Sequence, residues 1–313
     1  MEFIPKNDIL EFRPNTLVEV RKLYNLDKPG RMQDAINILN EWVQKQSHFK
    51  KKDFSSFYLE TAIVACKGSI EKAKSQIDKI CTMRTLLPQF FGDYNIKNDF
   101  GRLNEVAKVV MLPKLTEDFY RIYLCKFKGP PHDSSEFMSF YRANIILAEY
   151  LKIHDYLSGF MIIIDYSDVN LMDYVSKINP VELRQAMSIY IEGYGMKIKA
   201  IHIISPSKLI ESLVTIMKQV LSPKVAGRIN VHKSVEELRK VVPKSVLPKD
   251  YEGEEKSIQE LQDQWLDILS SEENLNNLRD MNAAATDEAF RSTDTFSEQC
   301  AGMPGTFRLL SVD

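Results

Sequence analysis

Apolar positions recur at helical spacing along the N-terminal part of the chain. Between Met32 and Val43 they lie three or four positions apart, and a second stripe runs from Ile70 to Cys81. The segment 54–66 between these stripes is apolar enough to form the buried helix of a small bundle. Because no strand pattern precedes Leu115, we predict that residues 1–92 form a helical region.

After Pro113 the pattern changes to short runs of β-branched and aromatic residues. These runs cover residues 119–127, 160–169, 197–205 and 228–234, and helical stretches separate them. Strands that alternate with helices favour an α/β fold with a largely parallel sheet. We therefore predict a second domain over residues 93–255.

Polar residues typical of helix starts precede the helical stretches. The first two such helices are predicted to run to Tyr156 and to Tyr194. The start signals are Asp133 with Glu136, Asn179 with Pro180 and Glu182, Ser205 with Pro206, and Ser234 with Glu237. Residues 256–313 are predicted to form one long amphipathic helix, begun by Ser257 and Glu260, and a polar tail.

Composition narrows the class of protein. Hydrophobic residues make up 44% of the 313 residues, and 41 basic against 43 acidic residues give a net charge of −2. The chain can therefore bury a core, and a globally basic nucleic-acid-binding protein is excluded. No apolar run is long enough to span a bilayer, and the N-terminal residues lack a signal-peptide pattern. We expect a cytoplasmic protein whose scattered cysteines, Cys66, Cys81, Cys125 and Cys300, are reduced and bind no zinc.

Motifs for catalysis are missing from the sequence. It contains no GxGxxG, GxxxxGK, GxSxG or HExxH pattern, so an esterase would lack its nucleophile elbow. His202 and His232 lie on predicted strands and could ligate a metal, but core or sheet-edge histidines are the more frequent meaning. Asp165 closes a predicted buried strand, where it could act as a catalytic acid or accept backbone hydrogen bonds. We predict neither an enzyme nor a cofactor or metal site.

The helix predicted over residues 208–221 has a wide apolar face. At 100° per residue its apolar side chains, from Leu209 to Leu221, fill one arc of roughly 160°. A helix that rests on a sheet needs a stripe of about 100° or a little more. Burying this face is worth several kcal/mol at about 25 cal/mol per Å², so something must cover it in water. A core helix with thick coverage is one explanation, and a lid over an apolar ligand is the other.

Neighbouring segments could face the same space as this helix. Asn144 lies within an apolar stripe, where it could anchor a ligand headgroup or bond to the backbone. We predict a pocket for one hydrophobic molecule, lined by Tyr141, Asn144, Ile145, Ala148, Ile162, Ile178, Ile189, Tyr190, Tyr194, Ile201, Ile210, Leu213, Val214, Met217 and Leu221.

Two pairs of cations flank the same helix in sequence. Lys197 and Lys199 are two apart at a strand start, and Lys224 and Arg228 are four apart beyond the helix, so each pair shares a side. We expect the two pairs at the two borders of the lid. Scattered lysines usually mark a solvated surface, but this basic set could also bind phosphorylated lipid headgroups.

Several ordered segments resemble a known family. Residues 197–232, the segment LPKDYEGEE, the strand FMIIIDYSDV, the stretch 65–84 and the ending GTFRLLSVD are similar to CRAL-TRIO (Sec14-like) proteins. The likeness is greatest to their alpha-tocopherol transfer and retinaldehyde-binding branch, in particular its insect members. It implies a helical N-terminal bundle and a mixed sheet flanked by helices, with a hydrophobic pocket closed by a gate helix at 209–221.

The resemblance also implies a function. The protein would be a monomeric intracellular carrier of a tocopherol, retinoid, carotenoid or similar lipid, cytoplasmic and peripheral at membranes. Lys197, Lys199, Lys224 and Arg228 match the family's phosphoinositide contacts, and phosphoinositide would help to open the gate. The family's basic run is replaced by YLETAIV, so no basic contact is expected from the N-terminal helices. The alternative is a scaffold or sensor that recruits a partner and holds a lipid that does not exchange.

Overall fold

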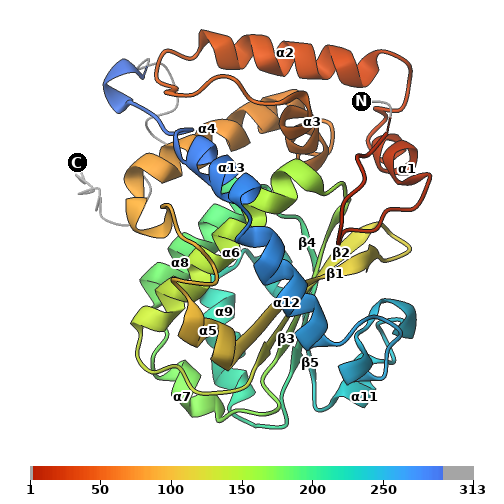
Figure 1. The fold of residues 1–313 in the computed structure, drawn as a ribbon, viewed down its shortest axis with the longest axis vertical. Coiled ribbons are helices and arrows are strands. Elements are labelled where there is room, and N and C mark those ends of the chain that lie inside the picture. Colours follow the sequence, from red (N-terminus) through yellow and green to blue (C-terminus); the bar gives the residue numbers. More distant parts are fainter. Residues whose placement is uncertain (1–2, 292–313) are drawn as a thin grey trace, which may run out of the picture.

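The computed structural model describes residues 3–291, so the predicted ending GTFRLLSVD lies outside the described residues. Helices at the N-terminal end pack together at the top of Figure 1, as predicted. Ser55 and Ser69 cap two of them, because their side chains accept hydrogen bonds from the backbone N–H groups of Tyr58 and Lys72. The bounds are α1 Thr16–Lys22, α2 Arg31–Lys45, α3 Ser56–Ala65, α4 Ile70–Leu86 and the short η1 Pro88–Phe90.

Within the described residues the strands form one sheet in the order β1-β2-β3-β4-β5. The β1–β2 pair is antiparallel and the other pairs are parallel, which confirms the predicted α/β fold with a mixed sheet. The bounds are β1 Ala107–Leu115, β2 Tyr120–Phe127, β3 Gly159–Asp165, β4 Ile198–Ile204 and β5 Ile229–His232.

Strand β1 corrects the prediction that no strand precedes Leu115. It follows directly on α5, Gly101–Val106, and contains Pro113. Proline argues against a central strand but is tolerated at a sheet edge, and β1 is one of the two edge strands. The free edge of β1 is covered by α12, Ile258–Leu269, whose Trp265 Nε1 donates to the Met111 carbonyl at 2.8 Å. This edge is therefore covered by a helix and not by another strand.

The two faces of the sheet are covered differently (Figure 1). One face, called the front, is covered by α6 Ser135–His154, α7 Leu171–Val175, α8 Pro180–Ser188 and α9 Ile210–Val220, and α10 Pro223–Ala226 follows α9. The other face, called the back, is covered by α11 Val235–Leu238, η3 Lys244–Val246 and η4 Lys249–Tyr251. Tyr251 donates to the Asp165 carboxylate at 2.6 Å, which fixes η4 over β3.

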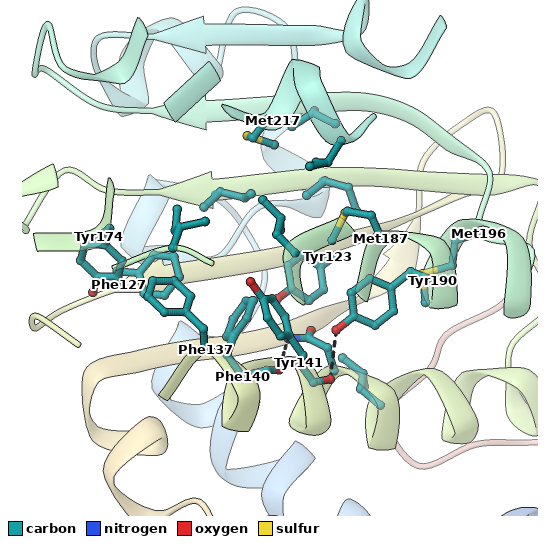
Figure 2. Close-up of a pocket in the computed structure, with 18 of the residues that line it drawn as sticks. Tyr123, Phe127, Phe137, Phe140, Tyr141, Tyr174, Met187, Tyr190, Met196 and Met217 are labelled. Atoms are coloured by element: carbon teal, nitrogen blue, oxygen red, sulfur yellow. Dashed lines mark hydrogen bonds between the residues drawn. The ribbon is translucent and has the colours of Figure 1, made fainter. Parts of the chain in front are cut away.

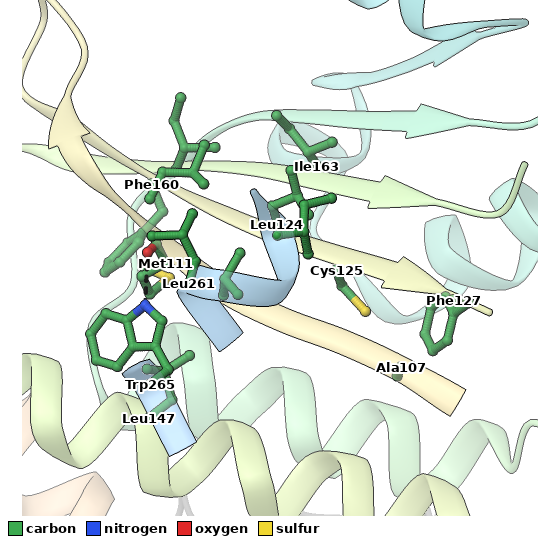
Figure 3. Close-up of a cluster of buried hydrophobic side chains, with 14 of the residues drawn as sticks. Ala107, Met111, Leu124, Cys125, Phe127, Leu147, Phe160, Ile163, Leu261 and Trp265 are labelled. Atoms are coloured by element: carbon green, nitrogen blue, oxygen red, sulfur yellow. Dashed lines mark hydrogen bonds between the residues drawn. The ribbon is translucent and has the colours of Figure 1, made fainter. Parts of the chain in front are cut away.

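A closely packed core joins the sheet to α12 (Figure 3). Leu124, Ile163, Leu261 and Trp265 belong to it, and each is at most 1% exposed. A second cluster of buried side chains joins α2, α3 and α4 to α6 and to the segment that follows α8. The N-terminal helices and the sheet region therefore share a continuous apolar contact through α6.

Some predicted helix boundaries are wrong. The helix expected after Ser205 and Pro206 begins at Ile210, because the Ser205 hydroxyl accepts from the Ser207 N–H in a turn. Asp133 accepts from the N–H and hydroxyl of Ser135, so it does not form a capping box and α6 starts later, ending at His154. Ser234 precedes α11 without a side-chain cap, and Glu237 accepts from the N–H of Lys233 instead.

The two remaining long helices are interrupted. Asn179 caps α8 as predicted, but α8 ends at Ser188 and a wider π-helical turn, Ile189–Gly193, continues it. The capping box of Ser257 and Glu260 is confirmed. The expected single C-terminal helix is two, because Ser271 caps a new helix, α13 Glu272–Asn282, before the last short turn, Glu288–Phe290.

Candidate ligand-binding site

A cavity with an almost wholly apolar wall lies between the front of the sheet and α6, α8 and α9. Its volume is about 200 Å³, and a single water needs roughly 10–15 Å³ on the same measure. It therefore has room for a ligand rather than for isolated waters. The predicted pocket residues in its wall are Tyr141, Asn144, Ala148, Ile162, Ile178, Tyr190, Ile201, Leu213, Met217 and Leu221.

Aromatic side chains form one side of this cavity (Figure 2). Phe137, Phe140 and Tyr141 of α6 point toward Tyr123 and Phe127 of β2. Phe137 lies on the same apolar stripe as Tyr141 and Asn144, which the sequence pattern already indicates. Phe140 and Phe127 were not predicted, because periodicity does not show how far a pocket extends.

Polar groups in the wall are mostly satisfied by the protein itself. The Tyr190 hydroxyl donates to the Tyr141 carbonyl at 3.0 Å, and the Asn144 amide donates to the Phe140 carbonyl at 2.8 Å. Of the two roles predicted for Asn144, the structure therefore shows the backbone hydrogen bond. Burial raises the pKa of Tyr123 and Tyr190 well above the usual value, so both phenols stay neutral. The wall suits an uncharged, apolar ligand body.

Helix α9 covers the cavity loosely. Leu213, Met217 and Leu221 line it, yet within α9 only Ile210 and Leu213 are fully buried. Thr215 and Gln219 on the opposite side are exposed. A core helix with thick coverage would bury most of its apolar arc, so this placement favours the lid over the core helix. That the helix opens stays a prediction.

Other predicted pocket residues lie outside the main cavity. Ile145 and Ile189 are buried against the N-terminal helices, because Ile145 points off another side of α6 and the π-helical turn that holds Ile189 packs against α4. Ile210 and Val214 pack on the sheet core beside the cavity wall. Tyr194 lines a second, smaller cavity.

The basic set, Lys197, Lys199, Lys224 and Arg228, gathers at one end of α9. The prediction of two separate borders is wrong, because β4 and β5 are parallel neighbours that start side by side. The Arg228 guanidinium donates to the Ile198 carbonyl. Burial lowers the pKa of Lys199, and the nearby charges of Arg228 and Lys224 lower it further. The four cations, which lie in two separate segments of the sequence, thus form one patch.

Two details of this patch were not predicted. Lys67, in the turn between α3 and α4, contributes its charge to the field at Lys197 and Lys199, so the N-terminal region does supply a cation. Lys197 Nζ donates to the Tyr24 hydroxyl at 2.6 Å and to the Val64 carbonyl at 3.0 Å. Burial, and then the charge of Lys199, lower the pKa of Lys197 to about 7. Lys67 escaped notice because its position depends on the turn.

The candidate catalytic and metal-binding side chains have hydrogen-bond partners within the protein. Asp165 accepts from Tyr251 and from the Ser167 N–H, which is the backbone role considered for it. His202 Nδ1 lies 2.9 Å from His232 Nε2, and no group of three or more possible metal ligands occurs within residues 3–291. Over the same residues, every helix is too short or too polar to cross a bilayer.

Comparisons with known proteins place this fold. Residues 109–253 match the CRAL/TRIO domain, and residues 28–100 match the Pinta-like UBA domain. The domain boundaries predicted at residues 92 and 255 stay predictions. Alpha-tocopherol transfer protein-like proteins of Homo sapiens and Mus musculus are 31% identical over 98 residues, covering 31% of this chain and only 28% of each relative. The crystal structure of Sfh5 aligns with TM-score 0.50 and 10% identity, covering 87% of this chain and 99% of that one. The chain therefore contains a CRAL/TRIO domain, matched over residues 109–253, and its fold is Sec14-like.

Proposed function

We propose that this protein is an intracellular, non-enzymatic carrier of one small hydrophobic molecule, such as a tocopherol, retinoid or carotenoid. The observation that carries the proposal is the apolar cavity under α9. Burying the apolar body of a ligand there replaces water contacts at about 25 cal/mol per Å². The CRAL/TRIO domain and the alpha-tocopherol transfer protein-like relatives support the same ligand class. The carrier would be a cytoplasmic monomer, peripheral at membranes, with no cofactor.

Exchange of the ligand requires two states of the gate. In the closed state α9 covers the cavity, and in the open state its apolar arc meets the bilayer. The basic set with Lys67 lies beside the end of α9, where it would hold phosphates of anionic, phosphoinositide-containing membranes. Because these phosphates are present only at the membrane, their binding would favour opening of the gate there.

The rival scaffold function could use the helix from Ser257 or the polar tail as its docking surface. On the helix, Leu261, Trp265 and Leu269 of α12 are buried in the core, while most of the tail lies outside the described residues. The apolar face of α12 is therefore used within the chain.

A transfer assay separates the two functions. Donor vesicles carry a fluorescent tocopherol analogue, and acceptor vesicles contain or lack phosphatidylinositol bisphosphate. We expect the protein to accelerate transfer, and more so toward acceptors with phosphoinositide. A protein that takes up the analogue but never delivers it would contradict the carrier function and favour the scaffold.

A further inference from the structure

A second cavity lies next to the main one. It has a volume of about 60 Å³ and is enclosed by α3, the C-terminal end of α6 and residues 194–197. Four side chains contribute to the walls of both cavities, namely Ala148, Leu151, Phe160 and Met196. These shared apolar side chains, which include the flexible Met196, separate the two cavities. A long ligand in the main cavity would thus end close to the second one.

Most polar groups around the second cavity already have partners. Asp155 is paired with Arg121 at 2.8 Å, and Tyr194 donates to Glu149 at 2.6 Å. The Thr61 hydroxyl donates to the Lys152 carbonyl at 3.1 Å. Lys197 is held by Tyr24 and Val64, as described above. These groups have little capacity left for a ligand.

Lys152 is the exception among the described residues. Its side chain lines the second cavity and the residue is only 7% exposed, yet Nζ donates no hydrogen bond within residues 3–291. Nζ lies 5.3 Å from the centroid of the Tyr58 ring, and the Glu149 carboxylate acts on it through its charge without a hydrogen bond. An ammonium group has three donors, and burying it without acceptors costs free energy. Burial accordingly lowers the pKa of Lys152 to about 8. An acceptor in the cavity would remove this cost.

We propose that Lys152 binds a carboxylate, the end group of an amphipathic ligand whose apolar body occupies the main cavity. The inference rests on the proposed carrier function and narrows its ligand class to apolar acids. The size of the second cavity supports a carboxylate, because about 60 Å³ accommodates only a few heavy atoms when one water needs roughly 10–15 Å³. A phosphoinositide headgroup is too large for it. The same chemistry could be met by a small free carboxylate from solvent.

The test compares two probes with the same apolar body, oleate and oleyl alcohol. Their affinities are measured for the wild-type chain, for Lys152→Met, and for Lys74→Met, a half-buried control lysine on α4. We expect Lys152→Met to weaken oleate binding about tenfold or more, since hydrogen bonds to charged groups are the strong ones. Oleyl alcohol binding should change less than about twofold, and Lys74→Met should leave both affinities unchanged.

Two results would overturn the inference alone. Equal loss of both probes would make Lys152 a structural residue, and unchanged oleate binding would remove it from the site. If the wild-type chain takes up the fluorescent tocopherol analogue but neither probe, this inference falls and the carrier function stands; if it takes up none of the three, both fall.

Carbon-13 NMR of the carboxyl group identifies the occupant without a variant. Carboxyl-labelled oleate bound to the wild-type chain should titrate at lower pH than free oleate, because the ammonium stabilises the carboxylate. The same shift seen with labelled acetate, but not with oleate, would assign the site to a free carboxylate. No shift with either compound would refute carboxylate binding at Lys152.

Discussion

The front and back of strand β3 differ although the same residue type occupies both. Ile162 and Ile164 face the cavity and are half-buried, whereas Ile163 faces the back and is 0% exposed. Tyr251 and the segment around it close the back through the hydrogen bond to Asp165, while α9 covers the front with few buried side chains. Consecutive isoleucines thus contribute to a filled core on one side and to a ligand site on the other.

This difference shows where the chain can hold a guest. Close packing on the back surrounds Ile163 and Leu124 with protein side chains, and these contacts stabilise the sheet. On the front, an apolar wall without protein partners loses those contacts unless a ligand supplies them. The predictions below test this division.

The largest effect is expected at the gate. Met217→Asp places a carboxylate in the apolar wall, where its desolvation opposes any apolar ligand, so ligand retention should be abolished with helix content nearly normal. Gln219→Asp, on the exposed side of α9, is the matched control and should retain ligand. Retention and circular dichroism are the measurements. Normal retention in Met217→Asp would contradict the placement of the lid.

A matched pair on β3 tests the two faces directly. Ile163→Phe overpacks the back, and we expect the free energy of unfolding to fall by about 1–3 kcal/mol. Ile162→Phe extends into the cavity, so unfolding should change by less than about 0.5 kcal/mol while ligand capture decreases. Urea unfolding and a capture assay measure both. Equal destabilisation by the two variants would mean that the front is packed like the back.

Charge reversal separates capture from delivery. Replacing all four members of the basic set by Glu should weaken transfer of the tocopherol analogue to anionic vesicles several-fold and its capture much less, since none of the four lines the main cavity, although Lys197 lines the second one. The control reverses four exposed lysines elsewhere, Lys28, Lys45, Lys50 and Lys233. Equal loss of capture and transfer would make the patch structural.

The smallest effect concerns pH and the back of the sheet. Burial, and then the charge of His232, lower the pKa of His202 to about 4. Because the folded state disfavours protonation of His202, the neutral side chain contributes to the free energy of unfolding. This contribution is fully present above the unfolded pKa of about 6.5 and is lost as the pH falls toward 4. His202→Leu should therefore reduce the drop in the urea midpoint between pH 7.5 and 5, whereas a change at the exposed His132 should not. An unchanged drop would contradict the burial cost.

Sequence patterns predicted elements better than their assembly. Helical stripes and short apolar runs identified the N-terminal helices and β2 to β5, but Pro113 and the adjoining helix concealed β1. Tyr141, Ala148 and Met217 were found because a pocket wall follows the same periodicity as a core. Lys152 carries no such signal, because its burial depends on α3 packing over the end of α6. Contacts between distant segments decide such positions, and local periodicity does not contain them.

Native mass spectrometry of the purified chain tests the cavity most directly. The account predicts a monomer with one apolar molecule bound, which extraction can identify and which Met217→Asp fails to retain. A chain that carries no such molecule, and takes up none from a panel of tocopherols, retinoids and fatty acids, would contradict it.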